Sequence, residues 1–128
     1  MNPTDILGRG KIFSLMQIIT DPITLEELQT LANHLFENMV KAVVDVDKER
    51  LAVDAELHSD LEALLLESGS KQKDLWGINL YPALTGEDFV EFDSMINLKP
   101  SLGNRTRGVD DASLRARIIS IVKKNVKP

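Results

Sequence analysis

The stretch ELHSDLEALLLESGSKQKDLWGINLY, residues 56–81, decides the fold of this chain. It holds the densest apolar run, together with the only Trp and the only Tyr. Its leucines recur at helical spacing after a capping Ser59 or Asp60, and Gly69 suits the left-handed position that ends a helix. Residues 74–82 then read as a strand that closes at a proline. The pattern predicts a strand end, a short helix and a second strand in succession.

The segment before this stretch predicts a strand, a helix and a β-hairpin. Residues 14–20 form a short apolar run rich in β-formers. A capping box that begins at Thr24 precedes leucines at three- and four-residue spacing, which predicts a helix over about 24–38. Residues 39–47 and 51–57 are rich in strand formers and flank a short polar turn, as the arms of a hairpin do.

The segment after the stretch predicts one more strand and a last helix. Residues 88–100 read as a strand that ends at Pro100, and residues 111–126 as a helix with lysines in its last turn. The order is therefore β-α-β-β-α-β-β-α, which predicts a single α+β domain over residues 14–128 with a mixed sheet and helices mainly on one face. Residues 1–13 show no periodicity and are expected to form a poorly ordered tail.

Composition limits the classes of function. The chain has 128 residues, no cysteine and a net charge of −5. Disulfides, thiolate metal sites and cysteine nucleophiles are excluded, and the negative field disfavours binding to nucleic acid. No leader sequence and no apolar stretch of membrane-spanning length is present, so a cytoplasmic protein without a membrane partner is expected.

Polar side chains on the sheet suggest a first candidate site. If helices cover one face of the sheet, the alternation of side chains brings Glu56, His58, Asn79, Asp93 and Asn97 to the other face. Carboxylate and amide oxygens suit Mg²⁺ or Mn²⁺, and one imidazole can move protons near neutral pH. The spacing matches no zinc-binding motif, so no metal ligand set and no cofactor are assigned. The competing interpretation is a solvated face whose charges discourage edge pairing.

The loop GNRTRG at residues 103–108 is the second candidate. Arg105 and Arg107 offer forked donors that fit phosphate or carboxylate, and the loop precedes the start of a helix. It is not a Walker loop, because the terminal Lys-Ser/Thr of that motif is absent. The two arginines also fit a structural role, in which they pair with the acidic sheet face or with a partner subunit.

Three segments of the chain resemble a family. They are ELHSDLEALLLESGS, DLWGINLYP and EFDSMINLKPSLGNRTRGV. Together they are similar to a small bacterial family of uncharacterised proteins, a domain of unknown function, over about residues 14–126. The resemblance implies a stand-alone single domain and transfers no activity, ligand or catalytic residue.

Two classes of function stay open at this point. The first is a small cytoplasmic interaction or regulatory domain without catalysis, which forms a homo-oligomer by extending its sheet between subunits. The second is a metal- or phosphate-dependent hydrolase-like enzyme with its site near His58, Asp93 and Arg105. It predicts that six side chains converge on one cleft, with two arginines as anion clamps: Glu56, His58, Asp93, Asn97, Arg105 and Arg107. The sequence alone does not decide whether the protein is an enzyme.

Overall fold

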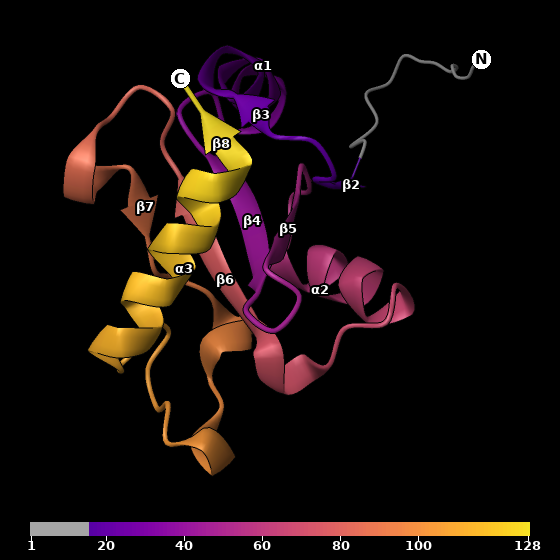
Figure 1. Cartoon of the computed structure of the whole chain (residues 1–128), viewed down its shortest axis with the longest axis vertical. Helices are drawn as coiled ribbons and strands as arrows, with labels where there is room; N and C mark the ends of the chain where they lie inside the picture. The colour runs from indigo at the N-terminus through magenta and orange to yellow at the C-terminus, as the bar shows by residue number, and fades with distance from the viewer. Residues whose placement is uncertain (1–15) are drawn as a thin grey trace.

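The computed structural model describes residues 16–128 (Figure 1). In chain order the strands and α-helices are β2 (Gln17–Ile18), β3 (Ile23–Thr24), α1 (Leu25–Leu35), β4 (Val40–Asp45), β5 (Arg50–Val53), α2 (His58–Glu67), β6 (Leu75–Leu80), β7 (Val90–Glu91), α3 (Ala112–Asn125) and β8 (Val126–Lys127). Short 3-10 helices are η1 (Gln72–Asp74), η2 (Gly86–Asp88), η3 (Met95–Asn97) and η4 (Pro100–Leu102). The predicted α+β class is confirmed, and the structure adds two short strands, β3 and β8, that the predicted order lacks. The tail predicted at residues 1–13 lies outside the described residues.

The main sheet has five antiparallel strands in the order β2-β5-β4-β6-β7. The central β4 pairs with β5 in the predicted hairpin and with β6 on its other side. A separate parallel pair, β3 with β8, ties the start of α1 to the end of α3. Figure 1 shows α3 crossing in front of the sheet, with β7 beside it at one edge.

The two faces of the sheet are buried by different helices. Val44, Trp76 and Ile78 belong to the larger apolar cluster, which α1 and α3 complete. Val43 and Leu75, from alternate positions of the same strands, belong to a smaller cluster completed by α2. The period of two predicted from the sequence therefore sets the faces correctly. The reverse face, expected to be open and polar, is in part covered by α2 and η3.

Local chemistry explains where the helices begin and end. Thr24 caps α1 through the predicted capping box, in which its hydroxyl accepts from the Glu27 N–H at 3.0 Å. The helix stops short of the predicted residue 38, because Glu37 adopts a left-handed φ of 71°. Helix α2 begins at His58, so the predicted caps, Ser59 or Asp60, are wrong and lie inside the helix. Leu57 at the N-cap offers no side-chain hydrogen bond. Gly69, with φ of 99°, follows its end as predicted.

The strand predicted over residues 88–100 is wrong beyond its first part. Only Val90–Glu91 pairs with β6, and the chain then turns through η3 and η4. Ser94 leaves the sheet because its N–H donates to Arg107 O at 2.9 Å instead of to β6. None of the helices in residues 16–128 has the length and apolar content that a bilayer-spanning segment needs.

Candidate functional site

His58 occupies the first position of α2 and is buried, with 7% of its surface exposed. Its Nε2 lies 2.8 Å from Ile78 O. A carbonyl oxygen only accepts, so Nε2 carries the proton and donates it, and Nδ1 of the neutral ring is unprotonated. Burial lowers the pKa of His58 below 6.5, and the charges of Lys41 and Arg107 act in the same direction, while the Ile78 hydrogen bond and Asp93 oppose it. The ring is thus a neutral structural donor at neutral pH.

An ion pair between Asp93 and Arg107 lies near this histidine. Arg107 Nε is 2.7 Å from Asp93 Oδ1, and 55% of the Arg107 side chain and 45% of the Asp93 side chain are exposed. An exposed pair of this kind contributes at most about 1 kcal/mol to stability. The structure brings these two predicted side chains together, but each already engages the other. Arg107 is therefore not the unpaired anion clamp that the enzyme hypothesis requires.

Asn79 lies in a polar row that crosses three strands. It stands opposite Lys41 on β4 and opposite Glu91 on β7. Its Nδ2 donates to Glu91 Oε1 at 2.9 Å, and the Tyr81 hydroxyl donates to the same oxygen at 2.8 Å. Burial and the Glu91 carboxylate raise the pKa of Tyr81. The Asn79 NH₂ group thus has a polar partner, whereas Asn79 Oδ1 is buried without a hydrogen-bond partner among residues 16–128. Glu91 is the centre of this network.

Asn97 replaces a missing strand neighbour. Its Oδ1 accepts from the Gly77 N–H at 2.8 Å, and its Nδ2 donates to Gly77 O at 3.0 Å and to Arg107 O at 2.8 Å. The carboxamide therefore continues the ladder on β6 where β7 has ended, and it also holds the loop that carries Arg107. Asn97 is fully buried, so its role is structural.

Two predicted residues stand apart from this cluster. The side chains of Glu56 and Arg105 are exposed and make no hydrogen bond or ion pair within residues 16–128. The Arg105 backbone N–H donates to Asp110 Oδ2 at 3.0 Å, which fixes the loop and leaves the guanidinium outside. Within residues 16–128, no three His, Cys, Asp or Glu side chains are arranged to hold a metal ion.

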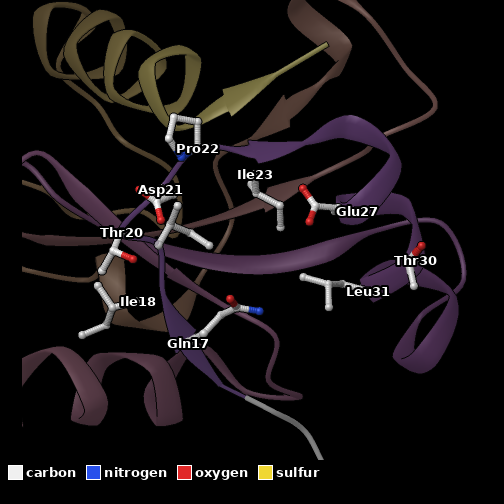
Figure 2. A pocket seen from close by; sticks show the side chains of 10 residues that line it. Gln17, Ile18, Thr20, Asp21, Pro22, Ile23, Glu27, Thr30 and Leu31 are labelled. Carbon is white, nitrogen blue, oxygen red and sulfur yellow. The ribbon is translucent and has the colours of Figure 1, made fainter.

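A pocket of about 450 Å³ opens between β2 and the start of α1. Figure 2 shows Ile23, Glu27 and Leu31 on one side of it and Gln17 on the other. The Glu27 carboxylate is already engaged, because it accepts from the Thr24 N–H at 2.9 Å, and this bond lowers its pKa. Of the two acidic residues in the lining, Asp21 and Glu27, Glu27 is therefore part of the helix cap.

A groove of about 510 Å³ lies between β7 and α3. Its lining is mostly apolar or small and consists of Gly86, Glu87, Phe89, Val90, Phe92, Ala112, Arg115, Ala116, Ile119, Val122 and Lys123. Ala112 and Ala116 leave room that longer side chains would fill, and the phenylalanines form the opposite wall. Sequence reasoning missed this groove, although the helical spacing of Ala112, Ala116 and Ile119 is a signal for it.

The groove runs beside a free strand edge. Strand β7 ends the five-strand order, so one of its sides has no neighbouring strand in the sheet. The Tyr81 N–H donates to Phe89 O at 2.9 Å, so the Phe89 C=O faces β6, while the Phe89 N–H donates to Gly86 O in η2. Because successive residues of a strand alternate, Val90 directs its N–H and C=O outward. The open edge ends at Phe92, because Gly108 from the following loop lies close to Phe92 O.

These features define a small α+β domain with an apolar groove at an open sheet edge. The chain belongs to a family described as a protein of unknown function (DUF5674), whose model matches residues 17–125. Neither the curated proteins nor the solved structures contain a match to this chain. The family relationship confirms the resemblance to a domain of unknown function.

Proposed function

We propose that this chain is a non-catalytic interaction domain that binds an extended segment of a partner protein in the groove between β7 and α3. The observation that carries the proposal is the combination of an apolar groove with an open strand edge. Exposed apolar surface of this kind marks interaction sites in proteins. The cytoplasmic location expected from the sequence remains part of the same proposal.

Strand addition is the binding mode that fits this geometry. A partner segment would pair with the outward N–H and C=O of Val90, and its alternate side chains would enter the groove. Val90 and Phe92 both pack against the larger apolar cluster, so the side chains of an added strand on that face would meet α3. The free edge is short, so the apolar contacts with Ala116 and Ile119 must supply much of the affinity.

The polar cluster around His58 supports the non-catalytic part of the proposal. His58 Nε2 is bound to a backbone oxygen, Arg107 is paired with Asp93, and the Asn97 amide holds the backbone of β6. Each of these groups has a structural partner, whereas the hydrolase hypothesis needs them free in one cleft. The side chains of Glu56 and Arg105 make no hydrogen bond or ion pair with them within residues 16–128.

The test is selection of nine-residue peptides from a randomised display library on the full chain. We expect enriched peptides whose affinity falls at least about tenfold on Ala116→Trp, because the indole fills the groove. Ala63→Trp is the matched control, since Ala63 is an exposed alanine of α2. Circular dichroism checks that both variants fold. No enrichment, or equal binding to the two Trp variants, would contradict the proposal.

Two further experiments test whether the peptide pairs with the strand edge and whether a second copy of the chain occupies the groove. A selected peptide that is N-methylated on the residues pairing with the outward edge of Val90 loses those hydrogen bonds and should bind more weakly, whereas N-methylation of the intervening residues should not weaken it. Light scattering reads the oligomeric state. A dimer that Ala116→Trp converts to a monomer would show that a second copy of the chain occupies the groove. That outcome would overturn the assignment to a different partner and would support the homo-oligomer predicted from the sequence.

A further inference from the structure

Helix α3 has a charge opposite to that of the whole chain. Its residues include Arg115, Arg117, Lys123 and Lys124 and no Asp or Glu, whereas the net charge of the chain is −5. Two of these cations have partners away from the groove. Arg117 donates to Val46 O, and Lys124 Nζ lies 3.0 Å from Glu49 Oε1.

The other two cations, Arg115 and Lys123, line the groove. Arg115 Nη1 donates to Val109 O at 2.6 Å, a neutral acceptor that leaves its charge uncompensated. The Arg115 charge lowers the pKa of Asp110, but less than the hydrogen bonds that the Asp110 carboxylate accepts from Thr106 Oγ1 and from the Arg105 N–H. Lys123 is exposed and has no ion pair or hydrogen bond from its ammonium group within residues 16–128. Glu87 is the acidic residue of the lining, on the side of the groove opposite the helix.

The spacing of these two cations matches one face of a strand. Arg115 and Lys123 are eight residues apart, which is about 12 Å along a helix. Residues i and i+4 of an extended segment point to the same side and lie about 13 Å apart. Ile119 lies midway between the cations, next to Ala116, where residue i+2 of such a segment would be.

We propose that the partner segment is acidic, with the pattern acidic-x-apolar-x-acidic on the side chains that face α3. This proposal rests on the proposed function and names the chemistry of its partner. The two carboxylates contact Arg115 and Lys123, and the apolar side chain fills the groove over Ala116 and Ile119. Although the protein has a net negative charge, this side of the groove is positively charged and attracts an acidic ligand.

The experiment compares three synthetic nine-residue peptides by fluorescence anisotropy against the full chain. TVETITEVT carries the proposed pattern, TVQTITQVT removes the charges, and TVTEIETVT has the same composition with the acidic residues moved to the other face. We expect the first peptide to bind about tenfold more tightly than either of the others, because each exposed ion pair contributes about threefold. The difference should shrink at high salt.

Variants of the helix locate the charges. Lys123→Gln should weaken the patterned peptide about threefold and leave the uncharged peptide unchanged. Lys124→Gln is the matched control, because Lys124 is the next residue and pairs with Glu49 instead. Equal affinity of all three peptides, with binding still lost on Ala116→Trp, would overturn the acidic pattern and leave the groove as the binding site. Absence of binding by all three, or binding unaffected by Ala116→Trp, would overturn this inference, and in the second case the groove as well.

Discussion

Replacing Gly77 by Ala tests how the polar side of the sheet is packed. A Cβ on Gly77 would lie 2.5 Å from Ser94 Cβ, 2.6 Å from Ser94 Oγ and 3.2 Å from His58 Cδ2. Carbon atoms in contact normally lie about 3.5–4.0 Å apart, so the overlap with Ser94 is about 1 Å. Ser94 is only 2% exposed, and its N–H is bonded to Arg107 O, so it has little freedom to move.

The expected cost of Gly77→Ala is about 2–3 kcal/mol of unfolding free energy, in the upper part of the range for overpacked cores. Urea denaturation measures it directly, and a loss of 2 kcal/mol would lower Tm by about 8 °C. Gly108→Ala is the control, because its Cβ would meet Phe92 O at 3.4 Å, and it should change stability by less than about 0.5 kcal/mol. The double variant with Ser94→Gly should recover part of the loss. If Gly77→Ala proves as stable as Gly108→Ala, the close packing of Gly77 against Ser94 and His58 is refuted.

Three other variants test separate parts of the structure. Because the pKa of His58 is lowered in the folded chain, the unfolded chain binds a proton at this residue more readily. The contribution of His58 to stability is therefore full above about pH 6.5, and it is lost as the pH falls through the folded pKa. His58→Gln keeps a donor for Ile78 O and should remove this part of the pH dependence, as thermal melts between pH 5 and pH 8 would reveal. Asn97→Asp places a carboxylate against Gly77 O and should cost about 3–5 kcal/mol in chemical denaturation; a loss below about 1 kcal/mol would argue against the amide ladder. Thr24→Ala breaks the capping box and should cost about 1 kcal/mol by the same assay, whereas Thr24→Ser should be close to neutral.

The fold could be predicted from the sequence where the determinants are local. The capping box at Thr24, the left-handed Gly69 and the alternation around Trp76 each depend on a few neighbouring residues, and each is confirmed. In these cases the residues that determine the local structure all lie within the same short segment.

The parts that could not be predicted depend on contacts between distant segments. Alternation assigns a residue to a face but does not say what covers that face, so the partial covering of the polar face by α2 was not foreseen. The strand predicted to reach Pro100 stops at Glu91 because Ser94 turns away to bond Arg107 O. The groove needs β7 and α3 side by side, and their lining residues, Gly86 to Phe92 and Ala112 to Lys123, are separated by the whole loop that carries η3 and η4.

Hydrogen exchange at the Val90 amide tests the central claim most directly. Its N–H points away from β6 at the open edge, so in the free chain it should exchange faster than the amide of Glu91, which faces β6. Addition of a peptide that binds the chain should protect Val90 and shift the resonances of Ala116 and Ile119. A bound peptide that leaves Val90 unprotected and shifts other surfaces instead would contradict strand addition in the β7–α3 groove.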